Sequence, residues 1–344
     1  MKNARLSPAV ALCALLFALA SCASPPATSG GAPPALHATL DAACGVLLCD
    51  GQQQATCFLV SADGWVLTAA HATMGSAPLT WDSPSLGLLP LERVAADPAH
   101  DIALLRLPAP AAGKPYPCLP IAAADPAAGT AVFGFGNPML RRRLLVAGML
   151  AEAGTSFEYL PDLGAFAECR HIAGGTIPGM SGGPWVTAQG DVVGIQSGGI
   201  SAHGAMQDIC WAAPRADMAR MATGRRSPDT ADLGAVTDSL YETNPEERQR
   251  FPAGAAGALV RRLHEGSALA AAGITPGSLI EKAGGIALGD RDSLLRVVRA
   301  AKPGSNLILI VRGPDGQARE CTVKLGRLYP FARPAHRAPA RAEK

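Results

Sequence analysis

The chain has 344 residues, of which 17% are charged, and its formal net charge is only +2. This weak and mixed charge argues against the extended basic surface of nucleic-acid-binding proteins, so we expect no nucleic-acid partner. At roughly 150 residues per domain, the length predicts about two domains.

The first 21 residues are predicted to be a lipoprotein signal peptide. Two basic residues precede an apolar run over residues 9–20, which is too short to cross a bilayer, and the run ends in Leu19-Ala20-Ser21-Cys22. This ending resembles a bacterial lipobox, which implies that Cys22 carries a lipid that anchors the mature protein to a membrane. Because Ala23 follows the cysteine, the resemblance implies an outer-membrane lipoprotein of the bacterial cell envelope that faces the periplasm. A plain secretory signal cut nearby is the alternative, and it also exports the protein.

Cysteine and histidine usage bears on cofactors. Of the nine cysteines, Cys13 leaves with the signal peptide and Cys22 is acylated, so seven remain in the exported chain. An odd number in an oxidising compartment leaves at least one thiol free or paired between molecules. No Cys-x-x-Cys spacing occurs and the histidines are scattered, so we expect neither a metal site nor any other cofactor.

Residues 22–40 are rich in proline and glycine and are predicted to be a flexible tether. Over residues 41–223, short apolar runs are separated by Gly, Pro, Asp and Asn, and helical periodicity is almost absent. Frequent short strands of this kind predict an all-β barrel or sandwich, closed by a short helix over residues 215–222. The predicted strands span residues 46–49, 56–60, 65–69, 86–94, 102–107, 131–135, 144–151, 166–169, 185–187, 192–196 and 209–212.

The pattern changes in the C-terminal third. Residues 224–249 are polar and turn-rich and are predicted to be a linker. Residues 250–327 mix short strands with two helical segments, which is typical of a small independent domain, and residues 328–344 are predicted to be a disordered tail. The predicted strands span residues 257–260, 278–280, 307–311 and 319–323, and the predicted helices span residues 267–272 and 290–301.

One motif places a serine on a glycine-rich turn, Gly179-Met180-Ser181-Gly182-Gly183-Pro184, which alone is a weak signal. Upstream, a short apolar strand ends in Thr68-Ala69-Ala70-His71, and Asp101 heads the strand over residues 102–107. A serine hydroxyl needs a base within hydrogen-bond reach. His71 is the candidate base, with Asp101 fixing its tautomer.

Each of these residues also has an ordinary explanation. His71 could be a core or surface group, Asp101 could only cap a strand, and Asp97 or His100 could be the functional residues instead. The occurrence of three motifs in this order, each at a strand end, favours His71, Asp101 and Ser181 as a catalytic triad. Asp97 and His100 are then predicted to be loop residues.

The order His71, Asp101, Ser181, with these flanking motifs, resembles a trypsin-like serine protease of the HtrA (DegP-like) type with a C-terminal PDZ domain, over about residues 41 to 326. The resemblance implies a mainly β fold, a chymotrypsin-like double β-barrel followed by a small α/β PDZ domain. It also implies an exported serine endopeptidase that cleaves unfolded or misfolded envelope proteins and peptides. A homo-oligomer is an expectation left open, because the turn between Cys49 and Thr56 is shorter than the loop used there for assembly. A catalytically inactive PDZ adaptor is the alternative, which the complete triad disfavours.

The resemblance also assigns roles around the serine. The backbone N–H groups of Gly179 and Ser181 are implied to form the oxyanion hole, where one donor is worth roughly 3 kcal/mol of transition-state stabilisation. Met180 stands where trypsin-type zymogens carry an aspartate that pairs with a newly cut amino terminus. A thioether cannot make that ion pair, so activation by clipping is not expected.

Substrate contacts are implied on two further segments. The floor of the specificity pocket is expected at Gly175 and Thr176, and the substrate backbone is expected to pair with Ser197, Gly198 and Gly199. Because the expected floor carries no charge, we predict a neutral, small to medium P1 side chain.

In the C-terminal domain, Gly257, Ala258, Leu259 and Val260 are implied to be the PDZ peptide-binding loop and strand. A terminal apolar side chain would lie between this strand and the helix over residues 290–301. The family's second barrel also implies that Cys169 and Cys210 lie side by side and form a disulfide.

Overall fold

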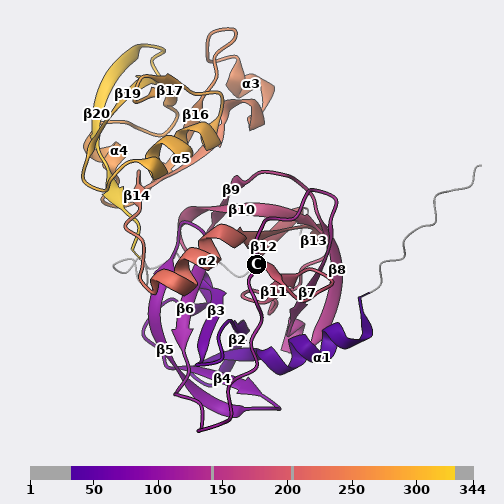
Figure 1. Cartoon of the computed structure of the whole chain (residues 1–344). Helices are drawn as coiled ribbons and strands as arrows, with labels where there is room; N and C mark the ends of the chain where they lie inside the picture. Colours follow the sequence, from indigo (N-terminus) through magenta and orange to yellow (C-terminus); the bar gives the residue numbers. More distant parts are fainter. Residues whose placement is uncertain (1–31, 141–142, 203–204, 330–344) are drawn as a thin grey trace, which may run out of the picture. The chain divides into compact units, whose positions relative to one another are not determined.

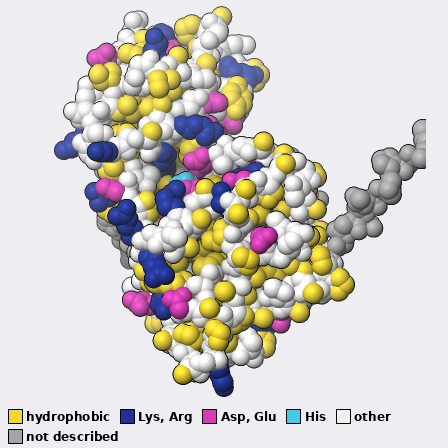
Figure 2. Space-filling model, viewed as in Figure 1, with side chains coloured by type: hydrophobic (Ala, Val, Ile, Leu, Met, Phe, Trp, Pro, Cys, Tyr) yellow, Lys and Arg dark blue, Asp and Glu magenta, His cyan; other side chains and the backbone are white. Residues whose placement is uncertain are grey.

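The computed structural model describes residues 32–140, 143–202 and 205–329 (Figure 1). These residues belong to one compact unit, Ala32–Lys344. The lipid anchor predicted at Cys22 and the tail residues 330–344 lie outside the described residues. None of the described helices combines the length and the apolar character needed to cross a bilayer. On the face drawn in Figure 2, acidic and basic side chains are interspersed among apolar ones.

The first β-barrel is closed by six strands in the order β1-β2-β3-β6-β5-β4. Successive residues of a strand point to opposite faces. Leu59 and Leu105 therefore join one buried cluster within this barrel, whereas their neighbours Phe58 and Leu104 join a cluster shared with the second barrel. The strands are β1 (Cys44–Cys49), β2 (Gln52–Leu59), β3 (Trp65–Ala69), β4 (Leu79–Ser83), β5 (Gly87–Asp97) and β6 (Ile102–Arg106).

The second barrel has the strand order β13-β12-β11-β7-β8-β10-β9, and an additional pairing of β13 with β10 closes it. β9 pairs with β10 alone and so extends from the closed ring as a hairpin. Trp185 is fully buried against Gly134 and Gly148, where an added Cβ would lie 3.0 and 2.9 Å from the indole. The strands are β7 (Ala131–Gly136), β8 (Leu144–Leu150), β9 (Ser156–Leu160), β10 (Ala165–Ala173), β11 (Pro184–Val186), β12 (Val192–Ala202) and β13 (Ala205–Pro214).

The expected double barrel is therefore confirmed. Every strand predicted over residues 41–223 corresponds to an observed strand, and the closing helix is observed as α2 (Arg215–Gly224). Two strands, β4 and β9, were not predicted. Between the strands lie two short 3₁₀ helices, η1 (Ala70–Thr73) and η2 (Pro138–Leu140).

The tether prediction is wrong for its last residues, because α1 (Pro34–Ala43) is a helix. Leu36, Leu40 and Ala43 recur at helical spacing and are buried in the core cluster of the barrels. Pro34 is tolerated because the first N–H groups of a helix have no partner within it. Each buried leucine contributes roughly 2 kcal/mol of hydrophobic stabilisation, which offsets part of the cost of ordering the segment. The proline-rich composition conceals this short amphipathic helix.

The C-terminal domain is a six-stranded sheet in the order β15-β16-β17-β19-β20, with β18 attached to β17. Its main helix, α5 (Arg291–Ala300), begins at Asp290, whose side chain accepts a hydrogen bond from the Ser293 N–H at 2.7 Å. Leu294 and Val298 of α5 are buried in the core of this domain. The other elements are β14 (Ala231–Asp232), β15 (Ala235–Ser239), η3 (Leu240–Glu242), α3 (Pro245–Arg248), β16 (Ala258–Leu263), α4 (Ala268–Ala271), β17 (Leu279–Ala283), β18 (Ile286–Ala287), β19 (Asn306–Arg312), β20 (Ala318–Lys324) and β21 (Gly326–Arg327).

The linker prediction over residues 224–249 is wrong for most of that segment, because β15 is a strand of the C-terminal sheet. It pairs with β16 along its whole length, and its Thr237 and Ser239 side chains are buried. Ser239 also forms a capping box with Glu242 that begins η3. The tail prediction is wrong at Leu328, which is buried. Polar residues that are buried in a sheet carry no apolar signal, so the sequence pattern did not reveal this strand.

Candidate active site

His71 and Asp101 meet where β3 and β6 end side by side. His71 lies in η1 directly after β3, and Asp101 lies in the turn directly before β6. Asp101 Oδ2 accepts a hydrogen bond from His71 Nδ1 at 2.7 Å, and Asp101 Oδ1 accepts one from the His71 backbone N–H at 2.8 Å. Because a carboxylate only accepts, Nδ1 carries a proton, and Nε2 of the neutral ring is left to act as a base.

The Asp101 backbone is strained and its side chain is fully buried. Its φ of +54° lies in the left-handed region, which costs a residue other than glycine about 1 kcal/mol. A third donor, the Ser197 hydroxyl, reaches the same carboxylate, and the Ala70 N–H donates to the Asp101 carbonyl at 3.1 Å. These contacts compensate the buried charge and hold the strained turn. Ser197, predicted as a substrate contact, thus directs its side chain to Asp101.

The pKa of His71 reflects two opposing effects. Burial of the ring lowers the pKa, but the charge and hydrogen bond of Asp101, with a further contribution from the charge of Asp162, hold the pKa of His71 above its ordinary value. A raised pKa strengthens His71 as a base towards a serine hydroxyl. It also means that the ring becomes protonated, and unable to act as that base, at mildly acidic pH.

Ser181 lies in the turn before β11, which packs against the first barrel. The Ser181 carbonyl accepts a hydrogen bond from the Thr56 N–H at 2.8 Å. A Cβ at Gly182 would lie 2.1 Å from Thr68 Oγ1 and 3.0 Å from the Ala69 nitrogen, so only glycine fits there. This close approach places the serine turn at the end of β3, from which the candidate base follows.

The oxyanion donors predicted at Gly179 and Ser181 are free to act. Gly179 has a φ of +99°, which glycine adopts without strain. The Pro178 carbonyl before it accepts from the Met139 N–H at 2.8 Å, and the Gly179 carbonyl accepts from the Thr56 hydroxyl at 2.9 Å. Among the described residues, neither the Gly179 N–H nor the Ser181 N–H donates to a protein acceptor. Two fixed and unpaired donors on one turn suit a developing negative charge.

The predicted substrate strand has an open edge beside the serine turn. On β12, Gly198 pairs with Trp211 and Gly199 with Cys210, both on β13. The ladder of β12 with β11 ends at Ile195. Beyond that residue, the edge of β12 opposite β13 has no strand partner within the described residues, so an extended peptide can pair there.

The predicted pocket floor, Gly175 and Thr176, lies between the end of β10 and the serine turn. Thr176 is buried. The assignment of these two residues to the specificity pocket stays a prediction.

Asp97 and His100 form a second buried pair close to Asp101. His100 Nδ1 donates to Asp97 Oδ2 at 2.8 Å, and His100 Nε2 lies 3.7 Å from Glu168 and 3.5 Å from Asp217. Burial lowers the pKa of His100, but Asp97, Glu168 and Asp217 together raise it to about 9. Arg220 pairs with two of these carboxylates. Asp97 is the last residue of β5, so the loop prediction is wrong for it, whereas His100 lies in the turn before β6 as predicted. Both belong to a buried cluster of charges, which the sequence did not predict.

The peptide-binding assignment to Gly257, Ala258, Leu259 and Val260 is also wrong. β16 pairs with β15 on one side and with β17 on the other, so these residues have no free edge for an added strand. Gly257 is required for another reason, since a Cβ there would lie 2.1 Å from the Ile280 carbonyl oxygen. The free edge of the sheet nearest α5 belongs instead to β15, which ends the strand order and contacts α5.

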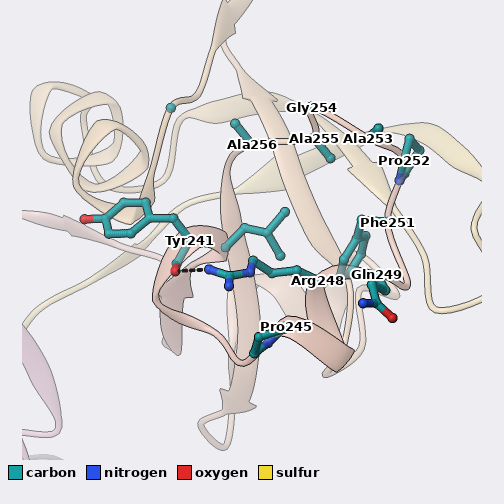
Figure 3. A pocket seen from close by; sticks show the side chains of 12 residues that line it. Tyr241, Pro245, Arg248, Gln249, Phe251, Pro252, Ala253, Gly254, Ala255 and Ala256 are labelled. Carbon is teal, nitrogen blue, oxygen red and sulfur yellow. Dashed lines mark hydrogen bonds between the residues drawn. The ribbon is translucent and has the colours of Figure 1, made fainter.

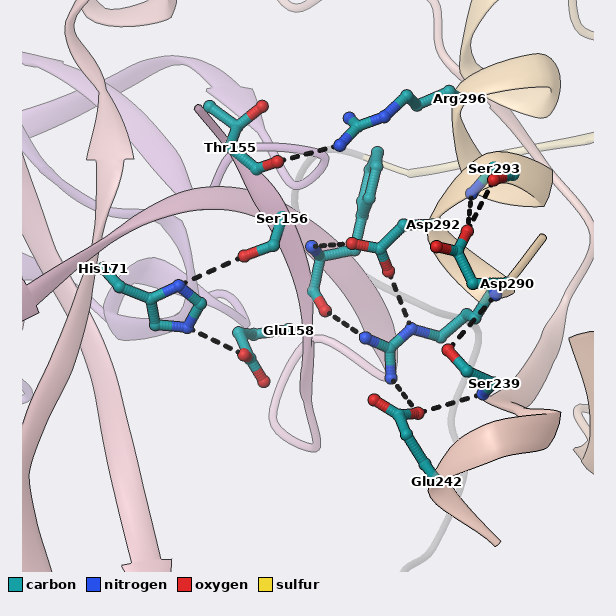
Figure 4. A network of polar contacts seen from close by, with 12 residues as sticks. Thr155, Ser156, Glu158, His171, Ser239, Glu242, Asp290, Asp292, Ser293 and Arg296 are labelled. Carbon is teal, nitrogen blue, oxygen red and sulfur yellow. Dashed lines mark hydrogen bonds and ion pairs between the residues drawn. The ribbon is translucent and has the colours of Figure 1, made fainter. Parts of the chain in front are cut away.

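The hairpin of β9 and β10 contacts this edge of the C-terminal domain (Figure 4). Phe157 and Phe166 of the hairpin pack on Leu295 of α5. The Phe157 N–H donates to Asp292 at 3.2 Å, and the Phe157 carbonyl accepts from Arg291 at 2.9 Å. The hairpin thus supplies both an apolar side chain and backbone partners to the first turns of α5.

The far end of the same hairpin packs near the candidate base. Leu160 and Leu163 share a buried cluster with Ala70, Ala99 and other small residues around η1. One hairpin therefore touches both the neighbourhood of His71 and the C-terminal helix.

A separate cavity of about 600 Å³ lies in the C-terminal domain between η3, α3 and the segment before β16 (Figure 3). Apolar side chains such as Phe251 and Pro252 line it, and Arg248 donates to the Tyr241 carbonyl at its wall at 2.7 Å. None of the candidate catalytic residues lines this cavity. Across the described ranges, no group of three or more His, Cys, Asp or Glu side chains is arranged to hold a metal ion.

The predicted disulfide between Cys169 and Cys210 is wrong, because both thiols are free and buried. In the register of β10 with β13, Cys210 is opposite Ile172, whereas Cys169 is opposite Ser156 on β9. The two cysteines lie on paired strands but not at paired positions.

Two residues near the serine were missed at the level of sequence. Thr56 contacts the Gly179 carbonyl, and the Asn137 N–H donates to the Thr56 hydroxyl at 3.1 Å. The only sequence signal for Thr56 is that it is a polar residue, between Ala55 and Cys57, within an otherwise apolar run.

Residues 55–195 match the family described as trypsin-like peptidase domain. The chain is 25% identical over 285 residues to a probable periplasmic serine endoprotease, DegP-like, of Ectopseudomonas mendocina, covering 81% of this chain and 57% of that protein. It is also 25% identical over 285 residues to a protein of the same description from Hahella chejuensis, covering 81% and 58%. The chain thus spans little more than half the length of the curated relatives that it matches.

Solved structures show the same fold. An HtrA-type protease, AlgW with a tripeptide, matches with a TM-score of 0.60 and 21% identity, covering 89% of this chain and 99% of that one. A serine endoprotease from Yersinia pestis matches with a TM-score of 0.57 and 17% identity, covering 85% and 98%. Residues 55–195 therefore match a trypsin-like peptidase domain, and the chain as a whole is similar to DegP-like serine endoproteases and shares the fold of HtrA-type proteases.

Proposed function

We propose that the protein is a serine endopeptidase in which Ser181 is the nucleophile, His71 the general base and Asp101 the carboxylate that orients it. The Ser181 oxygen adds to the scissile carbonyl carbon as its proton passes to His71 Nε2. The carbon–nitrogen bond then breaks, and the leaving amine takes that proton. Water adds to the resulting acyl-enzyme with His71 again as base, which releases the acid and regenerates Ser181.

The observation that carries this proposal is the 2.7 Å contact between His71 Nδ1 and the buried Asp101 carboxylate. It fixes the tautomer that a base at Nε2 requires, and it stabilises the imidazolium formed during attack. The unpaired N–H groups of Gly179 and Ser181 supply the second requirement, a preformed site for the oxyanion. Together they support an enzyme over an inactive adaptor.

Labelling with an active-site fluorophosphonate tests the assignment. We expect the wild type to be labelled and to cleave casein, and Ser181→Ala to do neither. Ser305→Ala, which removes a hydroxyl in the C-terminal domain, is the matched control and should behave as the wild type. Casein cleavage by Ser181→Ala would overturn the choice of nucleophile, and an unlabelled wild type would favour the adaptor.

The substrates we propose are unfolded or damaged proteins of the bacterial cell envelope, cleaved after neutral, small to medium side chains. The relatives are named as periplasmic, which supports an envelope location. We further propose that Cys22 is lipidated and holds the protein at the outer membrane. Cys22→Ser should move the exported protein from the membrane fraction to the soluble fraction. Assembly into a homo-oligomer stays a prediction, which light scattering on the purified protein checks.

We also propose that the C-terminal domain is a PDZ-like module that binds the carboxyl termini of proteins. The groove is assigned to the free edge of β15 beside α5 rather than to β16, since strand addition needs an unpaired edge. Peptides that end in an apolar residue should bind the full chain, and a carboxyl-terminal amide should abolish that binding. Equal binding of the acid and the amide would argue against a carboxylate site.

A further inference from the structure

Thr56 lies outside the triad, on β2 of the first barrel, and is fully buried. Its hydroxyl donates to the Gly179 carbonyl at 2.9 Å and accepts from the Asn137 backbone N–H at 3.1 Å and from Asn137 Nδ2 at 3.2 Å. A threonine hydroxyl has one donor and two acceptor positions, and all of them are used here. The Thr56 side chain therefore has one fixed orientation.

The Thr56 backbone contacts the same turn. Its N–H donates to the Ser181 carbonyl at 2.8 Å, and its own carbonyl accepts from the Thr68 hydroxyl at 2.7 Å. One residue of β2 thus bonds the carbonyls of both Gly179 and Ser181, whose N–H groups are the candidate oxyanion donors.

The peptide before Gly179 is fixed from the same side. The Pro178 carbonyl accepts from the Met139 N–H at 2.8 Å, and the Asn137 carbonyl accepts from Gln53 Nε2 at 2.7 Å. An added Cβ at Gly179 would lie 2.6 Å from the Asn137 carbonyl oxygen, so the turn rests directly on this segment. Thr56 is the residue that ties the segment at Asn137 to the Gly179 carbonyl.

We propose that Thr56 is a positioning residue for the oxyanion site, whose hydroxyl fixes the Gly179–Met180 peptide, which lies between the two peptide units that carry the Gly179 and Ser181 N–H groups. The Met139 N–H holds the peptide that carries the Gly179 N–H, and the Thr56 hydroxyl holds the next peptide through the Gly179 carbonyl, at a glycine whose backbone allows a wide range of angles. Without the hydroxyl, the Gly179 carbonyl loses its donor and the Asn137 N–H loses its acceptor. The Gly179–Met180 peptide can then reorient, and the adjoining peptide units, which carry the two oxyanion N–H groups, shift with it. This inference rests on the proposed serine endopeptidase activity.

Steady-state kinetics on a short peptide, with three variants of the full chain, tests the proposal. Thr56→Val keeps the shape but removes the hydroxyl, and we expect kcat to fall about 100-fold with KM within about twofold, the loss typical of one oxyanion donor. Thr56→Ser retains the hydroxyl and should stay within about threefold of the wild type. Thr243→Val is the matched control, since it removes a buried hydroxyl that donates to the Leu240 carbonyl at 2.8 Å in the C-terminal domain, and it should leave kcat unchanged.

A peptide boronate, which forms a tetrahedral adduct with the serine, gives a second measurement. Its affinity should fall in Thr56→Val by about the same factor as kcat, whereas affinity for a non-reacting peptide should not change. If Thr56→Val does not fold, Thr56→Ala is measured in its place with the same expectation.

The outcomes separate this inference from the proposed function. A wild type that is neither labelled by fluorophosphonate nor active overturns both. An active wild type with Thr56→Val at wild-type kcat overturns the positioning role alone. The same holds if Thr56→Ser is as impaired as Thr56→Val, because packing rather than the hydroxyl would then be responsible.

Discussion

Two Asp–His pairs lie within a few residues of each other and share the same contact, yet their surroundings differ. His71 Nδ1 lies 2.7 Å from Asp101, and His100 Nδ1 lies 2.8 Å from Asp97. Asp101 is the only carboxylate that His71 contacts among the described residues, whereas Nε2 of His100 faces two further carboxylates. The pKa of His71 is raised by Asp101 against burial, and that of His100 is raised to about 9.

An Asp–His contact alone therefore does not make a histidine a catalytic base. A histidine with a free Nε2 can accept a proton and give it back near neutral pH. A histidine enclosed by acids holds its proton throughout that range and acts as a structural cation. The role of each histidine depends on what surrounds its second ring nitrogen, Nε2, and the sequence does not show those surroundings.

Breaking the catalytic pair should have the largest effect. Asp101→Asn keeps the size of the side chain but offers an amide N–H₂ to the ring, so the wrong tautomer of His71 is favoured. We expect kcat to fall by about 10⁴-fold, as in other Ser-His-Asp enzymes, with little change in KM. Steady-state hydrolysis of a peptide substrate measures this, with circular dichroism to establish that the variant is folded. A fall of less than tenfold would contradict the role given to Asp101.

Breaking the second pair should affect stability instead. His100→Gln removes a buried cation and leaves Asp97, Glu168 and Asp217 without their shared partner, so we expect a loss of about 3 kcal/mol in the free energy of unfolding. The kcat of the folded variant should stay within about threefold. Urea unfolding measures the first quantity, and His37→Gln, at an exposed histidine, is the control. A large fall in kcat without loss of stability would show that His100 takes part in catalysis.

The two pairs should also respond differently to pH. His71 must be neutral to act, so kcat/KM should rise with pH through a midpoint above the ordinary histidine value of about 6.5. A midpoint at or below that value would contradict the effect assigned to Asp101.

The free energy of unfolding should change with pH in the opposite direction to kcat/KM. The folded-state pKa of His100 lies above its unfolded value, so its protonation stabilises the fold fully below about pH 6.5. That contribution is lost as pH rises through about 9. His171, held by Glu158 and Glu152 with a pKa also raised to about 9, adds to the same trend. The free energy of unfolding should therefore fall between pH 6.5 and 9, and less steeply in His100→Gln. Equal slopes of the free energy of unfolding against pH in the variant and the wild type would show that His100 does not contribute to this pH dependence.

The smallest effect is expected where the β9–β10 hairpin contacts α5. Asp292→Ala removes the acceptor of the Phe157 N–H and loosens the cover over the β15 edge. We expect peptides with apolar carboxyl termini to bind about threefold more tightly, measured by fluorescence anisotropy. Glu246→Ala, an exposed acidic residue on α3, is the control. Weaker binding by Asp292→Ala would mean that the hairpin does not compete with the peptide.

Local sequence was sufficient wherever chemistry or periodicity is local. The apolar runs predicted the barrel strands, and the motifs at His71, Asp101 and Ser181 predicted residues that the fold brings into one neighbourhood. Local sequence is insufficient where a structural feature depends on which strands pair with each other. The sequence predicts a free, peptide-binding edge at Val260 and its neighbours, although β15 pairs with them. The sequence of a strand does not show which other strands pair with it.

The same reason explains the missed residues. Thr56 and Gly179 are far apart in the chain, and a hydroxyl that bonds a distant carbonyl leaves no pattern in the sequence. The local sequence around Asp97 and His100 predicts only loop residues, because Glu168, Asp217 and Arg220, which surround them, come from other elements.

The β9–β10 hairpin makes the protein harder to divide than its sequence suggests. A truncation after residue 240 would remove Leu295 from Phe157 and Phe166 and would remove Leu328 from the small-residue cluster around η1. The barrel domain alone would then present aromatic side chains to water, an apolar patch of the kind that leads to aggregation. Loss of activity in such a fragment would report insolubility rather than a missing peptide-binding module, so point substitutions in α5 are the sounder way to dissect the two domains.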